Sequence, residues 1–135
     1  MTIRIAAAIS GLVLSSVMTL AAPSSPAGTW LAEDIDGGGV IDRVQTTLEL
    51  NDDGIVTGNG GCNRYAGSAN LSGGKITFRP MASTRMACPA AVMNQDTKFH
   101  RTLEKVAAWR IDEQKRKLLL LDKDGFEIMR LSRMK

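Results

Sequence analysis

The chain has 135 residues, with 17 Lys and Arg against 14 Asp and Glu, and its net charge is +3. This length is sufficient for one domain with a core of its own. Basic residues are spread over the whole chain and interleaved with acidic ones. The concentrated basic face and aromatic platform typical of nucleic-acid binding are not found in the sequence, so no nucleic-acid partner is expected. The tightest basic cluster is Lys115-Arg116-Lys117, between two apolar runs. We expect a solvated hairpin turn there, with a patch for anionic lipid as the alternative.

Residues 1–21 have the pattern of a cleavable signal peptide. Arg4 is their one charged side chain, and Ile5 to Leu20 form an apolar run broken only by small or hydroxylated residues. Thr19-Leu20-Ala21 places small residues at the −3 and −1 positions of a peptidase site, and Ala22 is the next-best cleavage position. The alternative is a permanent anchor, but the run is shorter than the ~20 apolar residues of a spanning helix. No cysteine follows at which a lipid could be attached.

Export therefore predicts a periplasmic or secreted product that meets the membrane only during export. Loss of Arg4 leaves 16 basic against 14 acidic residues, a net charge of +2. A short Pro/Ser linker, residues 22–27, then leads into a domain over residues 28–133. We expect this product to be a monomer.

Short apolar segments separated by Gly- and Asp-rich turns fill most of the domain, which predicts about seven or eight short strands. The expected strands are Thr29–Ala32, Thr46–Leu50, Ile55–Thr57, Gly67–Leu71, Lys75–Phe78, Trp109–Ile111, Lys117–Asp122 and Phe126–Leu131. Three pairs of them are joined by tight turns: Asn51-Asp52-Asp53-Gly54, Ser72-Gly73-Gly74 and Lys123-Asp124-Gly125. These pairs are expected to form antiparallel hairpins.

One segment, Ala90 to Val106, lacks glycine and follows Pro89, as suits the first turn of a helix. Its apolar residues share one helix face, and its polar residues are expected to face elsewhere. The apolar set is Val92, Phe99, Leu103 and Val106, and the polar set is Asn94, Gln95, Lys98, Arg101 and Lys105. The predicted fold class is α+β: a mainly antiparallel, open-barrel-like sheet with one amphipathic helix packed on it.

The sequence contains no recognisable catalytic or metal-binding cluster, so we expect neither an enzyme nor a cofactor. His100 is the sole histidine, and it is expected at the helix surface or packed by its edge. The even cysteine count of an exported chain favours a disulfide between Cys62 and Cys88, with two buried reduced thiols as the alternative. A Cys–His catalytic pair stays open at this stage, because such residues meet in space rather than along the chain.

Two segments contain distinctive motifs that the overall composition of the chain does not account for: Gly58–Gly67 and Met81–Pro89. Together with Gly28-Thr29-Trp30 and a closing Asp-Gly hairpin that ends at Leu131-Ser132-Arg133, they resemble the META domain family, which includes HslJ-like heat-shock-inducible envelope proteins. The resemblance spans residues 28–133. It implies a small, mainly antiparallel fold with one helix, a secreted, periplasmic or lipoprotein setting, and association with stress responses, antibiotic tolerance or secretion. It implies no known reaction.

The two segments also supply the candidate binding loops. Gly60, Gly61 and Asn63 tolerate left-handed backbone, so we expect a sharp turn that aims Cys62 inward. The candidate binding residues are Asn63, Arg64, Tyr65, Thr84 and Arg85. Arg64 and Arg85 are candidates for an anion-binding corner, and the alternative is that each pairs with a local carboxylate or carbonyl group.

These features favour a non-enzymatic exported envelope protein that supports envelope stress tolerance by binding a partner protein or an apolar ligand. Two alternatives use the same fold differently. In one, the strands enclose a cavity that carries a lipid-like molecule. In the other, an exposed strand edge pairs with another envelope protein.

Overall fold

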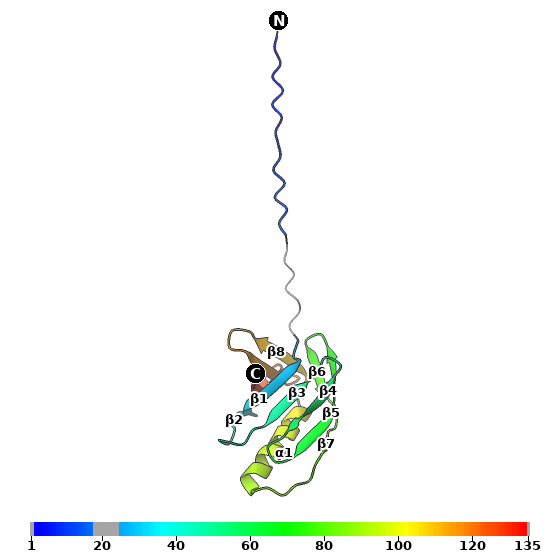
Figure 1. Ribbon diagram of the computed structural model, residues 1–135, viewed down its shortest axis with the longest axis vertical. Coiled ribbons are helices and arrows are strands. Elements are labelled where there is room, and N and C mark those ends of the chain that lie inside the picture. Colours follow the sequence, from blue (N-terminus) through cyan, green and yellow to red (C-terminus); the bar gives the residue numbers. More distant parts are fainter. Residues whose placement is uncertain (1, 18–24, 135) are drawn as a thin grey trace.

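A computed structural model describes residues 2–17 and 25–134 of the chain. Residues 2–17 are extended and project away from the domain (Figure 1), and their large apolar side chains are exposed, Ile9 by 93%. The expected cleavage positions, Ala21 and Ala22, lie outside the described residues. In the part of the chain that is described, no helix has the length and apolar character needed to cross a membrane.

The described residues form ten strands and one helix, all in the part of the chain that follows Ala27. In chain order these are β1 (Gly28–Ile35), β2 (Gly38–Gly39), β3 (Thr47–Leu50), β4 (Ile55–Asn59), β5 (Arg64–Ser72), β6 (Lys75–Phe78), β7 (Ala82–Ser83), α1 (Ala90–Glu104), β8 (Ala108–Asp112), β9 (Lys117–Leu121) and β10 (Glu127–Arg133). The structure thus confirms the α+β class and the single helix. The first and last strands begin and end at the predicted domain limits.

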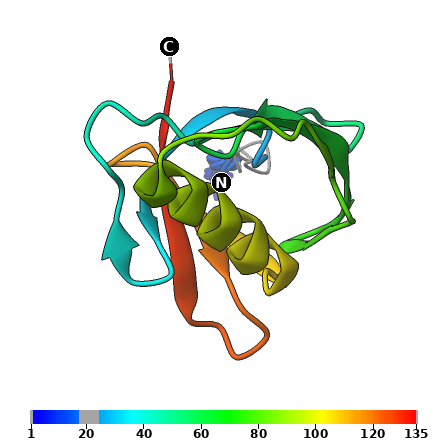
Figure 2. The same cartoon turned by 90° about the horizontal axis from the view of Figure 1, so that it is seen from below.

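Every strand pairing in the sheet is antiparallel. The strand order is β10-β9-β8-β6-β5-β4-β3-β1-β2, and β1 also pairs with β10, so that the sheet closes into a ring. Its weakest joint lies between β6 and β8, where only Lys75 and Ala108 pair. Helix α1 crosses one end of this ring (Figure 2) and contacts β1 and β6.

All three predicted hairpins form, as β3–β4, β5–β6 and β9–β10. In the last of these turns the Asp122 carboxylate accepts the N–H groups of Asp124 and Phe126, and Gly125 has a φ of 84°. The sequence pattern missed β2 and β7, because two residues are too few to show an alternation. It also placed the start of β5 too late, since pairing with β4 begins at Arg64.

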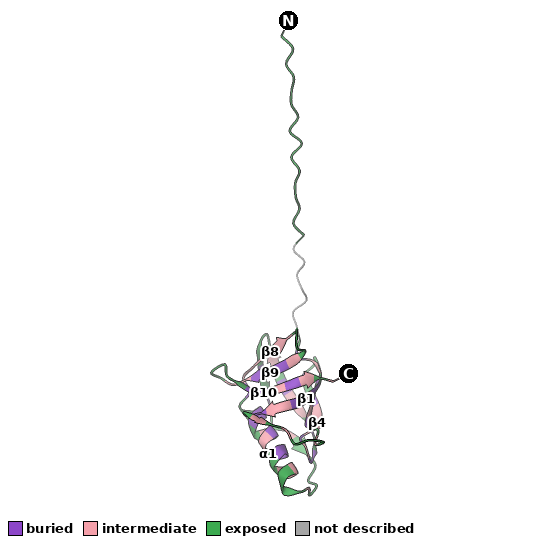
Figure 3. Cartoon of the chain, turned by 90° about the vertical axis from the view of Figure 1, so that its left-hand side faces the viewer, coloured by how far each residue is buried: buried purple, intermediate pink, exposed green. Residues whose placement is uncertain are grey.

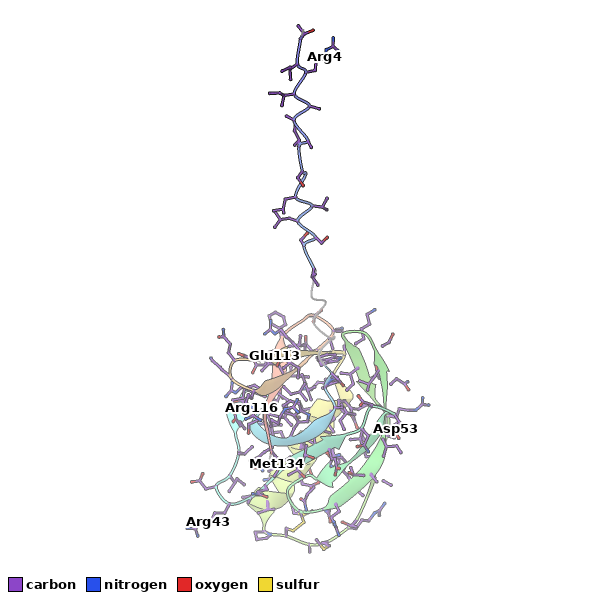
Figure 4. All side chains as sticks on the ribbon, turned by 45° about the horizontal axis from the view of Figure 1, so that its top comes forward. Arg4, Arg43, Asp53, Glu113, Arg116 and Met134 are labelled. Carbon is purple, nitrogen blue, oxygen red and sulfur yellow. A yellow bond between two sulfur atoms is a disulfide. The ribbon has the colours of Figure 1, made fainter. Side chains whose placement is uncertain are left out.

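The interior of the ring is a packed core rather than a vacant cavity. Trp30, Leu48, Ile76 and Leu120 are fully buried within one continuous apolar cluster. Figure 3 shows buried residues along β9, β10 and the inner side of α1, and Figure 4 shows side chains crowded between the strands. The closed sheet therefore encloses its own hydrophobic residues, as small rings of strands generally do.

The end of the predicted linker belongs to this packed body. Pro26 is buried, and its carbonyl oxygen accepts a hydrogen bond of 2.8 Å from the indole N–H of Trp30. Ser25 donates its hydroxyl to the Asp52 carboxylate at 3.0 Å. Residues 25–27 thus lie against the domain, and they satisfy the one polar atom of the largest core side chain.

The inner face of α1 is more polar than its apolar spacing indicates. Phe99 and Leu103 are buried as predicted, but Gln95, Asp96 and Thr102 are buried beside them. The expectation that Gln95 faces away from the sheet is therefore wrong. It fails because hydrophobic periodicity cannot identify polar side chains that bond to buried loops.

Replacement of Phe99 by alanine tests the contact between helix and sheet. Phe99 is 0% exposed, so F99A removes a filled volume and is expected to cost about 3–5 kcal/mol of unfolding free energy. Urea denaturation measures the loss. The matched control is F126A, because Phe126 is 67% exposed and its removal leaves no cavity. Equal effects of the two variants would contradict the described packing.

Candidate binding site

A disulfide joins the turn between β4 and β5 to the segment that precedes α1. Cys62 and Cys88 are bonded with an S–S distance of 2.08 Å and a Cα–Cα distance of 6.0 Å. This pairing confirms the predicted disulfide, and the alternative of two buried reduced thiols is not observed. It links the two distinctive sequence segments, which are separated by 26 positions in the chain.

The same turn is held from the helix side by Asp96. One carboxylate oxygen of Asp96 accepts the backbone N–H groups of Cys62, at 2.9 Å, and Asn63, at 2.8 Å. A Cβ atom at Gly60 would lie only 2.7 Å from that oxygen, so glycine is required where the backbone meets the carboxylate. Asp96 is 7% exposed, and these charge-assisted bonds offset the cost of burying its charge.

The Asn63 side chain connects the turn to the crossing segment before the helix. Its carbonyl oxygen accepts hydrogen bonds from the Thr84 hydroxyl, at 3.1 Å, and from the Met86 N–H, at 2.6 Å. The Thr84 hydroxyl in turn accepts the N–H of Arg64. Asn63 is buried, so two of the five candidate binding residues, Asn63 and Thr84, are engaged in holding the loops together.

A third segment reaches the helix through Gln95. The side-chain oxygen of Gln95 accepts the Ile41 N–H at 2.8 Å, and its amide nitrogen donates to the Thr46 hydroxyl at 2.9 Å. Thr46 then donates to the carbonyl oxygen of Gly60 at 2.9 Å. Consecutive helix residues thus organise two different loops, since Gln95 holds the segment before β3 and Asp96 holds the turn after β4.

Tyr65 is a buried member of the candidate set. Its hydroxyl donates to the Thr47 carbonyl oxygen at 2.7 Å and so ties β5 to β3 across β4. Gly58, on β4, makes this reach possible, because a Cβ there would lie 2.7 Å from the tyrosine oxygen. Burial raises the pKa of the Tyr65 hydroxyl, and the negative charge of Asp96 raises it further. This side chain therefore stays neutral and donates its proton to the backbone.

His100 packs edge-on against two rings, with centroid distances of 5.1 Å to Tyr65 and 5.3 Å to Phe99. Its Nε2 atom is buried without a hydrogen-bond partner, 3.7 Å from the Asp96 carboxylate. Burial lowers the pKa of His100 below its ordinary value, and the charges of Asp96 and Glu104 only partly oppose this. The predicted edge packing is thus observed. Because both cysteines form the disulfide, neither offers a free thiol to this imidazole.

The two arginines of the candidate set differ from the other members, because both are exposed. Among the described residues neither Arg64 nor Arg85 forms an ion pair, so the expected local carboxylate partner is not observed for either. Arg64 lines a polar groove of about 530 Å³ that also includes Gln45, Glu49 and Asn59. The assignment of Arg64 and Arg85 to one anion-binding corner stays a prediction.

Two further grooves flank strand β7, and we call them the β7 grooves. One, of about 320 Å³, is lined by Arg64, Tyr65, Ala66, Ala82, Ser83 and Thr84. The other, of about 410 Å³, lies between this strand and α1 and is lined by Phe78, Arg79, Pro80, Met81, Ser83, His100, Leu103 and Glu104. Ser83 lines both grooves. The disulfide and the Asn63 bonds hold this part of the surface in place.

Fold and site together define a class: a small α+β domain whose closed antiparallel sheet is crossed by one helix, with a disulfide between the turn after β4 and the start of that helix. The chain belongs to the META domain family, whose model matches residues 23–135. Two structures solved by NMR are similar to it. One, from Burkholderia xenovorans, is 22% identical, with a TM-score of 0.62 over 80% of this chain and 82% of that one. For the other these values are 21%, 0.58, 78% and 88%.

At this level of sequence identity, both similarities concern the fold alone. No curated protein matches the chain.

Replacement of Asp96 by alanine tests the seating of the turn on the helix. D96A leaves two buried N–H groups without an acceptor, which is expected to cost about 1–3 kcal/mol for each. Chemical denaturation of the oxidised protein measures the loss. The control is D42A, at an exposed position in the loop before β3, which should unfold with the wild type. A D96A protein as stable as D42A would contradict the assigned role.

The environment of His100 predicts a stability loss in acid. The folded-state pKa lies below the ordinary value of 6.5, so the unfolded chain binds more protons as the pH falls below 6.5. Unfolding free energy should therefore be constant above that pH and decline below it, before most carboxylates titrate. In H100Q this part of the decline should be absent. Urea midpoints between pH 8 and pH 5 measure it, and parallel profiles of both proteins would count against the prediction.

Proposed function

We propose that this protein is a non-enzymatic exported envelope protein that supports envelope stress tolerance by binding a partner protein along β7. The observation that carries the proposal is the free outer edge of this strand. β7 pairs with β5 through Tyr65–Ser83 and Ala66–Ala82, and among the described strands it has no second neighbour. Exposed strand edges are sites where another chain can add a strand.

The hydrogen-bonding direction of β7 identifies the group that faces outward. Thr84 donates its N–H to the carbonyl oxygen of Arg64 on β5. Because neighbouring residues of a strand point their backbone groups to opposite sides, the N–H and C=O of Ser83 point away from β5. Both residues of β7 are exposed. A partner strand would bond at Ser83, with the two β7 grooves available for its side chains.

The chemistry of the β7 grooves suits a partner with apolar side chains. Phe78, Met81 and Leu103 line the larger groove, and Ala66 and Ala82 lie in the smaller one. An apolar small molecule is the second candidate occupant of the larger groove. The packed core favours such a surface site over the enclosed cavity of a lipid carrier. Native mass spectrometry of protein purified from cells tests this candidate, since a bound molecule would add its mass.

The proposal of export rests on residues 1–21, whose sequence has the signal-peptide pattern. The described part of this segment makes an extended arm with exposed apolar residues, which is consistent with removal before the protein works. The disulfide supports an oxidising compartment. The non-enzymatic proposal is supported by the Cys62–Cys88 bond, which occupies both thiols, and by the buried Nε2 of His100.

A proline at position 83 tests the strand edge. S83P removes the outward N–H while leaving the bonds between β7 and β5 intact, because proline is tolerated on an edge strand whose N–H faces solvent. In a deletion strain grown under heat, detergent and envelope-targeting antibiotics, the wild-type gene should restore growth and S83P should not. S83A, which keeps the N–H, is the matched control.

Wild type, S83P and S83A must be present in equal amounts as oxidised protein and must have equal melting temperatures. These two controls distinguish misfolding from loss of binding. Full complementation by S83P would overturn the β7 assignment while leaving the stress role in place. A deletion strain that grows like its parent under all three conditions would overturn the stress role itself.

A further inference from the structure

The outer face of α1 carries a row of cationic side chains that the β7 surface does not use. Lys98 and Arg101 of α1, and Lys105 directly after its last residue, recur at spacings of three and four residues, so they lie on one side of the helix. With the β1–β2 turn they line a groove of about 440 Å³, which we call the α1 groove. Asn94 and Thr97 lie further along it. Asp36 is the one acidic residue in its lining.

The charges in the α1 groove are not balanced. Lys105 is neutralised by Asp36, with 3.3 Å between the ammonium and the carboxylate. Lys98 and Arg101 form no ion pair with any of the described residues. Like charges three or four residues apart on a helix repel each other, and an anion bound between them would relieve this repulsion.

Lys98 is the most constrained of the three side chains. It is partly buried, and a Cβ atom at Gly38 of β2 would lie 2.6 Å from its ammonium nitrogen. The absence of a side chain at Gly38 thus lets the ammonium lie against the hairpin. Because Lys98 has no ion-pair partner among the described residues, its ammonium group is available to a ligand of opposite sign.

We propose that the α1 groove binds a phosphate group, independently of the function proposed for β7. The Arg101 guanidinium offers paired donors to two phosphate oxygens, and the Lys98 ammonium supplies a compact charge beside them. Asn94 and Thr97 provide neutral hydrogen-bonding groups at the rim. Inorganic phosphate and the headgroup of an anionic lipid present the same chemistry, and the experiment distinguishes these two sources.

The test follows backbone amide NMR signals of the oxidised, processed protein at low ionic strength. One arm adds inorganic phosphate, and the other adds vesicles of phosphatidylglycerol with phosphatidylcholine, or of phosphatidylcholine alone. The variant K98Q/R101Q removes the two unpaired cations. The variant R110Q/K123Q removes the same charges from exposed positions on β8 and in the turn between β9 and β10, and serves as the control.

Wild type and R110Q/K123Q should show saturable shifts at α1 and β2, and K98Q/R101Q should bind at least ~10-fold more weakly because two charge-assisted contacts are lost. A response to phosphate itself identifies a soluble ligand, whereas a response only to anionic vesicles identifies a lipid headgroup. Either response supports the site.

A stability measurement completes the test. Phosphate or anionic vesicles, whichever binds, should raise the melting temperature of the wild type and not that of K98Q/R101Q. Equal weakening of binding in both double variants would show that only the net charge of the protein matters, and would overturn the proposal. A wild type that responds to neither phosphate nor anionic vesicles would also overturn it.

Discussion

The hydrogen bonds from the N–H groups of Cys62 and Asn63 to the Asp96 carboxylate determine the arrangement of this end of the domain. They fix the turn after β4 against the helix, and the other contacts follow from that position. Cys62 is thereby presented to Cys88, and the Asn63 side chain is directed toward the crossing segment. The close approach of the backbone to the carboxylate leaves no room for a side chain at position 60, which accounts for the first glycine of the Gly-Gly-Cys-Asn sequence.

This arrangement explains why a small domain keeps polar residues inside its helix face. The segments around Ile41, Cys62 and Met86 have backbone groups that no strand partner satisfies, and side chains of the neighbouring helix and turn bond to them instead. The disulfide then closes a loop that has few apolar contacts of its own, because residues 82–87 are all exposed. Entropy of the unfolded chain favours such a crosslink by about 3–4 kcal/mol. Covalent and polar contacts thus replace a hydrophobic core at this end.

The sequence was sufficient to predict what depends on local pattern. Alternating apolar residues and Gly-containing turns gave the three hairpins, and spacing gave the helix that contains Phe99. Closure of the ring between β1 and β10 was not predictable, since it depends on partners more than 90 residues apart. The site was harder still. Asn63, Tyr65 and Thr84 were named for their place in the motif, but all three form hydrogen bonds inside the protein. Asp96, which accepts the Asn63 N–H, was not among the candidates.

The polar side chains of α1 fall into two groups, those that bond to the protein's own backbone and those that are available to a ligand. Gln95 and Asp96 belong to the first group: each accepts a hydrogen bond from a backbone N–H, and that oxygen is then less available to a ligand. Arg64 on β5, together with Lys98 and Arg101 on the helix, forms no ion pair with any of the described residues. Like charges in a row on a helix repel each other, and an anionic ligand would relieve this repulsion. These outer cations and the free edge of β7 are therefore better candidates for binding sites than the polar network that holds the loops together.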